Sequence, residues 1–381
     1  MPFSHIRDQF PITRHYAYLN HAAIAPLANS TRQAIEAHLA EQAEGGALHF
    51  FDWLAALDRA RATFAGLIHA TEADIALCKN TTEGLATVAA GLDWRAGDRI
   101  VSFECEFPAN LYPWLGLRGR QVTVELLPAE ALADLDRVRS ACRGAKLLAI
   151  SFVQYLSGFR APLSEIGDIC RETGTWLVVD AIQGLGALPL DAPACGVHAL
   201  ACGSHKWLTG PEGGGFLYVH PALLDQLTPP QPGWLSVADW ADFDAGAKAA
   251  ASTAPLAWRI GAARLECGML NGPGLLGLAA AVELLQSAGA EAAANHILDL
   301  SQRLQAGLRR RGCQLCQLSS RREHLSGITS FQHPREDSAA VTARLEAAHI
   351  LCSHRGAWIR VSPHLYNTAD EIDSLLAALP Q

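Results

Sequence analysis

The sequence predicts an α/β fold with a mostly parallel sheet and helices on both faces, followed by a smaller C-terminal α+β domain. Between residues 74 and 220, short apolar runs alternate with helical patterns, and such alternation is typical of parallel sheets. The run 146–153 is apolar almost throughout, as expected of a strand that is buried on both faces. From residue 263 onward, long Ala- and Leu-rich helical patterns are mixed with short strands, which indicates a separate lobe.

Length and composition describe a large globular chain. Its 381 residues are 50% hydrophobic and 18% charged, which allows a sizeable core. The net charge of -8 argues against nucleic acid as the main partner. No apolar run reaches the ~18 residues of a membrane helix, and the N-terminal stretch lacks an apolar signal core, so we expect a cytoplasmic protein. The ten cysteines suggest neither a disulfide framework nor, from the lone CxxC at 313–316, a metal site.

A strand at 74–78 is followed directly by a helix that opens at Asn80-Thr81-Thr82. This arrangement points backbone N–H groups and the positive end of the helix dipole at one spot, which makes an anion site. Thr81 and Thr82 add hydroxyl donors. An ordinary N-cap at Asn80 or Thr81 explains the same pattern, so the residues alone leave both roles open.

The remaining elements follow from apolar periodicity and turn residues. The expected strands are 98–104, 121–127, 146–153, 176–180, 216–219, 326–332 and 357–362, and the expected helices are 30–44 (capped by Ser30 or Thr31), 52–69, 162–174, 274–288, 291–311, 337–349 and 370–379. Residues 221–260 carry prolines and an acidic-aromatic patch. They are expected to form a long loop region near the active site or a subunit contact.

A lysine in a glycine-rich turn is the main candidate for chemistry. Lys206 follows Ser204-His205 and precedes the glycines of 210–215, and Asp180 ends a buried strand upstream. Ligands of open α/β sheets bind at the carboxyl ends of strands. Lys206 could form a Schiff base with pyridoxal phosphate, although the lysine taken alone is better explained as a surface residue.

Three motifs occur in a fixed order along the chain. They are Val179-Asp180-Ala181-Ile182-Gln183-Gly184, Ser204-His205-Lys206-Trp207-Leu208 and Arg360-Val361-Ser362-Pro363-His364-Leu365-Tyr366-Asn367-Thr368. Together they resemble the class V aminotransferase group of fold-type I pyridoxal phosphate enzymes, which includes cysteine desulfurases, isopenicillin N epimerase-like proteins, kynureninases and C–S lyases. The resemblance runs from Tyr18 to the last helix. It implies a fold-type I transferase with a seven-stranded-type sheet, pyridoxal 5'-phosphate, an α-amino acid substrate and a homodimer with shared active sites.

The resemblance assigns cofactor roles to individual residues. Lys206 would be the catalytic Schiff-base lysine, Asp180 would pair with the pyridine nitrogen, and Gln183 would hydrogen-bond the phenolic oxygen. Phe107 would stack on the cofactor face, a position that Pro108 could equally occupy. The phosphate-binding residues would be Thr81, Thr82, His205 and Ser204.

The resemblance also assigns a substrate side. Arg360 would hold the α-carboxylate as a bidentate fork, with Arg355 as a second candidate. Asn20 and His21 would line the same side. The alternatives are a surface salt bridge for Arg360 and a loop histidine for His21.

The chain departs from the family's pattern on both sides of the cofactor phosphate. The residues before the lysine are Gly203-Ser204, the reverse of the usual order, so the Ser204 hydroxyl would meet the phosphate differently or not at all. The segment 264–271 matches a loop that in relatives reaches the partner subunit's phosphate. Met269 stands there in place of the usual threonine, so a hydroxyl contact is lost.

A third departure concerns the reaction. Desulfurases carry a nucleophilic cysteine on a loop before the final arginine, whereas here Cys352 precedes Arg355 and the segment to Arg360 is short. The sequence therefore favours aminotransferase-like action on an α-amino acid, with a C–S lyase or another side-chain elimination as the alternative. Epimerisation follows, and cysteine desulfuration and a non-catalytic cofactor-binding protein are disfavoured. The expected division is an N-terminal arm at 1–15 that joins the small domain, a large cofactor-binding domain at 16–262 and a small domain at 263–381.

Overall fold

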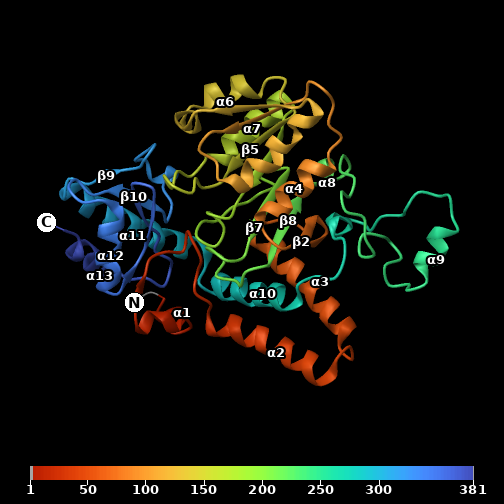
Figure 1. Ribbon diagram of the computed structural model, residues 1–381, viewed down its shortest axis with the longest axis horizontal. Helices are drawn as coiled ribbons and strands as arrows, with labels where there is room; N and C mark the ends of the chain where they lie inside the picture. Colours follow the sequence, from red (N-terminus) through yellow and green to blue (C-terminus); the bar gives the residue numbers. More distant parts are fainter. Residues whose placement is uncertain (1–2, 381) are drawn as a thin grey trace.

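The computed structural model describes residues 3–380 and contains a seven-stranded sheet (Figure 1). Its strands are β2 (Ile75–Cys78), β3 (Arg99–Phe103), β4 (Thr123–Leu127), β5 (Leu147–Ser151), β6 (Trp176–Asp180), β7 (Ala199–Gly203) and β8 (Gly215–Val219). They lie in the order β2-β8-β7-β6-β5-β3-β4. All pairs are parallel except those that β8 makes with β2 and β7. The predicted α/β class with a mostly parallel sheet is confirmed.

The side chains of the sheet alternate between two apolar clusters, one on each face. In β5, Leu148 and Ile150 belong to one cluster while Leu147 and Ala149 belong to the other. One face is covered by α4 (Thr81–Gly91), α5 (Tyr112–Leu115) and α8 (Pro221–Leu224), and the other by α3 (Phe50–Leu67), α6 (Leu135–Cys142), α7 (Leu163–Thr173) and α10 (Gly272–Ser287). Helices on both faces explain why the central strands β5, β6 and β7 are apolar at nearly every position.

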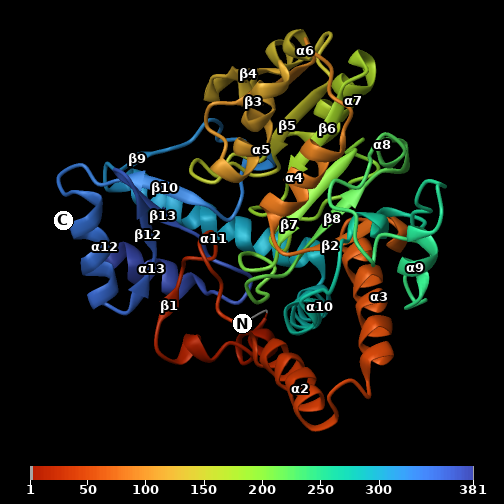
Figure 2. The same ribbon diagram turned by 45° about the vertical axis from the view of Figure 1, so that its right-hand side comes forward.

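A second, four-stranded antiparallel sheet forms the smaller unit, whose helices Figure 2 shows beside it. It runs β12 (Ser353–Arg355), β13 (Trp358–Val361), β10 (Thr329–Gln332) and β9 (Gln314–Leu315), and it packs with α11 (Ala290–Arg310), α12 (Ser338–Ala347) and α13 (Ala369–Ala378). This unit has an apolar cluster of its own.

The N-terminal residues lie against the smaller unit. After α1 (Ser4–Arg7), strand β1 (Ala17–Tyr18) pairs in parallel with β11 (Ile350–Leu351). The Arg7 guanidinium donates to the Tyr366 carbonyl at 2.9 Å and forms an ion pair with Glu371. These contacts support an arm that joins the small domain.

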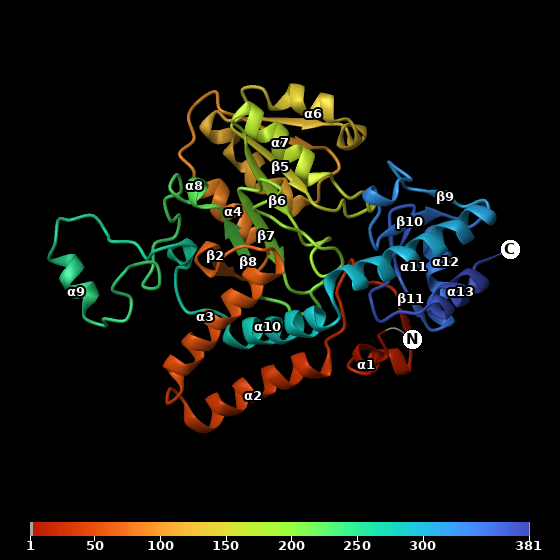
Figure 3. The ribbon, with the colours of Figure 1, turned by 180° about the vertical axis from the view of Figure 1, so that it is seen from behind.

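Helix α10 packs against α2 (Asn29–Gly45) and α3, not against the smaller unit (Figure 3). The packing favours a boundary between α10 and α11 in place of residue 263, and the division into domains stays a prediction. Within residues 3–380, no single helix has the length and hydropathy of a membrane span, although α10 and α11, which meet at 82°, satisfy both criteria when taken together.

Some local expectations were wrong. Helix α2 takes Ala28 as its N-cap, so neither Ser30 nor Thr31 is the cap. Strand β7 was not predicted because its sequence, Ala-Leu-Ala-Cys-Gly, has low β-propensity. The long region 221–260 contains α8, which packs on the sheet, and a further short helix, α9 (Ala245–Ala250), which lies in an arm that projects from the body (Figure 1).

Candidate active site

The candidate lysine, Lys206, lies in the connection between the neighbouring antiparallel strands β7 and β8. A 3.0 Å hydrogen bond from Ser204 N to Gly214 O closes the base of this connection. Burial lowers the pKa of Lys206 to about 8; the charge of Asp180 opposes this shift and that of Arg360 adds to it. A large fraction of the amine is therefore neutral near pH 8, as a nucleophile or a base requires.

Asp180 ends β6 as a buried carboxylate. Its Oδ1 accepts a 3.0 Å hydrogen bond from Ile182 N, and burial raises its pKa to about 6. Its neighbour on β5 is Ser151, whose backbone N–H donates to Glu106 at 2.7 Å. Burial also raises the pKa of Glu106 to about 7, and the Asp180 charge contributes to that rise. Two buried carboxyl groups thus meet at one strand end.

The Gln183 carboxamide is held in one orientation. Its Nε2 donates to the Ala22 carbonyl at 3.0 Å, and its Oε1 accepts from Trp207 Nε1 at 2.9 Å. An amide has two N–H donors, so one Gln183 N–H is left for a further acceptor. Trp207 is fully buried and directly follows the lysine.

The start of α4 forms a cradle of donors. Asn80 is the N-cap and accepts from Glu83 N at 2.9 Å, and Thr81 Oγ1 accepts from Gly203 N at 2.9 Å. A Cβ at Gly203 would lie 3.3 Å from Thr81 Oγ1 and 3.5 Å from His205 Nδ1. The threonine hydroxyl, the imidazole and the helix N-terminus therefore converge, which is the arrangement that binds phosphate.

An aromatic contact connects the lysine to Arg360 in the smaller unit. Lys206 Nζ lies 5.4 Å from the centroid of the Phe107 ring, and that ring meets Tyr155 edge-on with centroids 5.3 Å apart. The Tyr155 carbonyl accepts a 2.9 Å hydrogen bond from Arg360 Nη1. Arg360 is 2% exposed, and its Nε has no partner among residues 3–380. The site therefore spans both units, and Arg360 has donor capacity left.

Comparison with known proteins identifies the family. Residues 17–375 match the model of the family "Aminotransferase class-V". The chain belongs to this family. A probable cysteine desulfurase of Methanothermobacter thermautotrophicus is 28% identical over 97% of this chain and 95% of that protein, and one of Pseudomonas aeruginosa is 31% identical over 85% and 82%.

Solved structures give the same result. A lysine mutant of C-DES with glycine covalently linked to its PLP cofactor is 26% identical, with a TM-score of 0.88, and the match covers 97% of this chain and 98% of C-DES. C-DES is described as a cystine C–S lyase in its complex with cysteine persulfide, which matches with a TM-score of 0.87 at 26% identity over the same 97% and 98%. This class V chain is a pyridoxal phosphate-dependent enzyme of fold type I.

The residues of this class V site fit the cofactor. Asp180 and Lys206 are close enough to shift each other's pKa, yet within the described chain no ion pair joins them. A protonated pyridine nitrogen beside Asp180 would compensate its buried charge. The free Gln183 N–H suits the phenolic oxygen, and Thr81 and His205 suit the phosphate.

Four of the expected site residues differ from the rest in their exposure or in their hydrogen bonds, namely Ser204, Thr82, Asn20 and His21. The buried Ser204 hydroxyl donates to the Pro211 carbonyl, so it does not join the phosphate cradle, as its reversed order suggested. Thr82 is exposed, so its main contribution to a phosphate site would be its backbone N–H in the first turn of α4. Asn20 pairs with Ser362, and its buried Oδ1 has no partner among residues 3–380.

His21 is the fourth of these residues, and its ring is engaged inside the protein. Nδ1 lies 2.8 Å from the Ser362 carbonyl and Nε2 lies 2.6 Å from the Tyr366 hydroxyl. Burial and the nearby His364 hold the pKa of His21 well below its usual range. Because both nitrogens are occupied, the geometry favours a structural role, and the proposed substrate site does not include His21.

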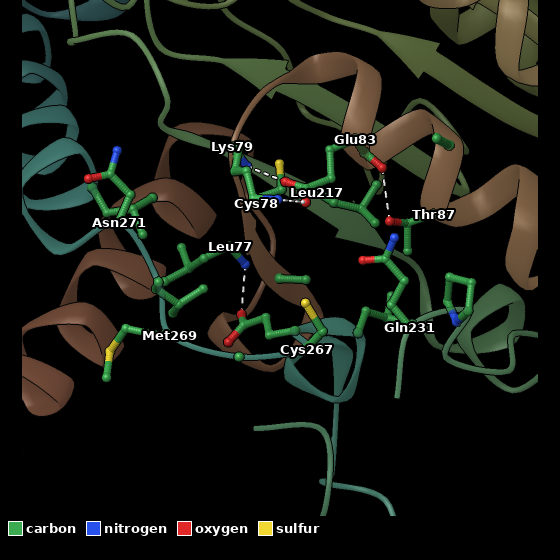
Figure 4. A pocket seen from close by; sticks show the side chains of 18 of the residues that line it. Leu77, Cys78, Lys79, Glu83, Thr87, Leu217, Gln231, Cys267, Met269 and Asn271 are labelled. Atoms are coloured by element: carbon green, nitrogen blue, oxygen red, sulfur yellow. Dashed lines mark hydrogen bonds and ion pairs between the residues drawn. The ribbon is translucent and has the colours of Figure 1, made fainter. Parts of the chain in front are cut away.

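The loop around Met269 borders a cavity of about 660 Å³ beside β2 and α4 (Figure 4). Glu266 fixes this loop, since its buried carboxylate accepts from Leu77 N at 2.7 Å and pairs with Arg61. Met269 is 69% exposed. The loop is therefore anchored at one end and open at the other, and its contact with a partner subunit's phosphate remains a proposal.

Three residues of the site were missed from the sequence: Glu106, Tyr155 and Trp207. Glu106 adjoins Phe107 directly after a strand, which was a usable signal. Tyr155 contributes only its carbonyl and an edge of its ring. Trp207 acts through Gln183, a contact across 24 residues that no local pattern reveals.

Proposed function

We propose that this enzyme is a C–S lyase that eliminates the sulfur substituent from the β-carbon of an α-amino acid, with transamination as the second candidate. The proposal takes Lys206, Asp180, Gln183, Phe107, Thr81, His205 and Arg360 as the site. We further propose a homodimer with shared active sites.

One observation supports elimination without an enzyme persulfide. Cys352, the cysteine nearest in sequence to Arg360, is part-buried, and burial raises the pKa of its thiol to about 12. Cys105, next to the strand end that holds Glu106, has a thiol pKa of about 12 for the same reason. A thiol is nucleophilic only as the thiolate, so neither is suited to accept sulfur. This agrees with the missing desulfurase loop.

Each residue of the proposed site has its own role in the reaction. When bound, pyridoxal phosphate supplies an electron sink for negative charge at the substrate's α-carbon. Asp180 keeps the pyridine nitrogen protonated, and Arg360 holds the α-carboxylate through Nη2 and the unpartnered Nε. Lys206 Nζ takes the α-proton in its neutral form, which its lowered pKa of about 8 makes available. Phe107, whose ring centroid lies 5.4 Å from Nζ, would stack on the face of the cofactor.

The atoms balance without an oxidant. The Cα–H bond breaks and its proton moves to Nζ, the Cβ–S bond breaks and its electron pair leaves on sulfur, and the sulfur takes up a proton. The three-carbon remainder departs as 2-aminoacrylate, which water converts to pyruvate and ammonia. With cystine the sulfur product would be cysteine persulfide, and with cysteine it would be hydrogen sulfide.

Transamination is the second candidate because it needs the same lysine, carboxylate and arginine. One relative with 27% identity over 96% of this chain carries the name of an uncharacterised aminotransferase from Bacillus subtilis. Transamination passes the amino group to a 2-oxo acid, whereas elimination releases it as ammonia.

The test is product analysis with the holoenzyme. L-cystine and L-cysteine are supplied with and without 2-oxoglutarate, and pyruvate, ammonia and reducible sulfur are measured. Elimination predicts equal pyruvate and ammonia without an oxo acid, and no activity in Lys206→Ala. Cys352→Ser should retain sulfur release; loss of release in that variant would favour a desulfurase instead. Turnover that needs 2-oxoglutarate and yields no ammonia would replace elimination by transamination.

A further inference from the structure

We propose that His364 is a positioning residue for Lys206. Its imidazole holds the carbonyl of Trp207, and this bond keeps the lysine turn (residues 204–210) in the conformation that places the amine. The inference rests on the proposed function, from which it takes the role of Lys206 as the lysine that binds the cofactor. It adds a buried side chain of the smaller unit to the groups that determine where this amine lies.

Four consecutive carbonyl groups of the lysine turn each accept a hydrogen bond from a different donor. In chain order the bonds are Gly210 N to Ser204 O (3.0 Å), Ala25 N to His205 O (2.8 Å), Thr209 N to Lys206 O (3.0 Å) and His364 Nε2 to Trp207 O (2.9 Å). Two of them lie within the turn, one comes from the N-terminal segment and one from the smaller unit. Only the bond from His364 is made by a side chain, so it is the one that a substitution can remove.

The hydrogen bonds of the His364 ring fix its tautomer. Nδ1 accepts from Leu365 N at 2.8 Å, so this nitrogen carries no proton and Nε2 carries the N–H that the Trp207 carbonyl accepts. The ring is fully buried, and burial lowers the pKa of His364 to about 4. The imidazole is therefore neutral near pH 7, and it restrains the lysine turn without adding a positive charge beside Lys206.

The lysine turn needs such a restraint because its backbone is strained. Thr209 has a φ of +51°, a left-handed conformation that is unfavourable for a β-branched residue. Its side chain is fully buried, and its hydroxyl has no partner among residues 3–380, so no side-chain bond compensates for the strain. Strained backbone of this kind persists where the surrounding structure holds it, and it is concentrated at functional sites.

Trp207 transmits the restraint to two groups of the proposed site. It directly follows Lys206, so a bond to its carbonyl fixes the backbone on one side of the lysine. Its indole Nε1 donates to Gln183 Oε1 at 2.9 Å. Without the bond from His364 the buried carbonyl would lose its partner, which is unfavourable. A shift of Trp207 toward another donor would move Lys206 and weaken its contact with Gln183.

Two amide variants separate the roles of the two ring nitrogens. In His364→Gln the amide N–H takes about the place of Nε2–H and still reaches the Trp207 carbonyl, whereas the shorter His364→Asn replaces only Nδ1 and leaves that carbonyl without a donor. His333→Asn is the matched control. His333 is a buried histidine of the same unit, whose Nδ1 accepts from Glu336 N and whose Nε2 lies 3.3 Å from the Pro380 carbonyl. Its bonds stay within the smaller unit.

The main readout is the pH dependence of cofactor uptake, measured by stopped-flow absorbance after pyridoxal phosphate is added to each apo enzyme. The rate for the wild type should level off near pH 8, because the pKa of Lys206 is about 8. In His364→Asn it should level off about one pH unit higher, because a displaced amine is better hydrated and approaches an ordinary lysine near ~10.4. His364→Gln and His333→Asn should match the wild type.

The substitutions leave the charges around the amine unchanged. The groups that act on the pKa of Lys206 are Asp180, Cys202, Arg355 and Arg360, so a shifted profile reports a change in the place or hydration of the amine. Arg360 and the exposed Arg355 belong to the strand pair β12–β13, whose register does not include His364. In the holoenzyme, His364→Asn should therefore lower kcat about tenfold and keep KM within about twofold of the wild type.

Several results would overturn the inference. They are a wild-type pH profile in His364→Asn, a shift in His364→Gln as large as that in His364→Asn, or an equal shift in His333→Asn. If His364→Asn does not fold, His364→Gln decides: a folded variant with the wild-type profile supports the inference, and an unfolded or shifted one overturns it. If pyridoxal phosphate causes no absorbance change with the wild type, the proposed function itself fails, whereas failures confined to the variants concern His364 alone.

Discussion

Replacing Asp180 by Asn should stabilise the enzyme without its cofactor. Burial raises the pKa of Asp180 to about 6, whereas an unfolded aspartate titrates near ~3.9. Ionising this carboxyl at neutral pH therefore costs the apo fold about 2 pKa units, or roughly 3 kcal/mol. Asparagine carries no charge and keeps an oxygen for the bond from Ile182 N.

The sign of the effect gives the test its pH window. A carboxyl whose folded pKa is raised costs stability above about pH 6 and costs nothing below about pH 4, where it is protonated in both states. Urea unfolding of the apo protein should therefore show Asp180→Asn gaining up to about 3 kcal/mol at pH 7.5, with the gain vanishing by pH 4. Asp225→Asn, an exposed control, should change little. A destabilised variant, or a gain independent of pH, would refute the reasoning. With pyridoxal phosphate bound, the gain should shrink or reverse, because the carboxylate then has a cationic partner.

Three further predictions test other parts of the site. The rate at which apo enzyme takes up pyridoxal phosphate should level off near pH 8, because the Lys206 amine has a pKa of about 8 and attacks only when neutral; stopped-flow absorbance that still rises to about pH 10 would indicate an ordinary lysine. Trp207→Phe removes the donor to Gln183 Oε1 and should lower the free energy of unfolding by about 2 kcal/mol, with weaker cofactor binding; unchanged binding would argue that Gln183 needs no such support. Glu266→Gln removes the buried partner of Arg61, which keeps only its ion pair with the exposed Asp58, and should cost about 3 kcal/mol in urea unfolding, whereas a loss below about 1 kcal/mol would show that the buried pair contributes little.

The predictable residues of the site are those whose roles follow from neighbours along the chain. Asn80 and Thr81 follow a strand and open a helix, and Asp180 ends a buried strand, so local rules of strand ends and helix starts place them. The sequence left two roles open for His21, because its environment is made by Tyr366, 345 residues away. No local pattern reports that both of its nitrogens are occupied.

The phosphate cradle explains why strand β7 has a sequence of low β-propensity. A Cβ at Gly84 of α4 would lie only 2.8 Å from the Ala201 Cβ on β7, so larger residues at either position would push the helix away from the strand. The same close approach brings Thr81 within 2.9 Å of Gly203 N. The small residues that weaken the β-signal are therefore the ones that allow the helix start to reach the lysine turn.

Charge links the substrate side of the site to its chemistry. The positive charge of Arg360 lowers the pKa of Lys206, so the group proposed to hold the substrate also helps to keep the amine neutral. A substrate carboxylate bound by Arg360 would cancel that charge on arrival and raise the proton affinity of Lys206 at the moment when the amine must accept the α-proton. Under this reasoning the α-carboxylate affects the proton transfer as well as the affinity, and the α-carboxamide analogue of a substrate should show a lower kcat as well as a higher KM.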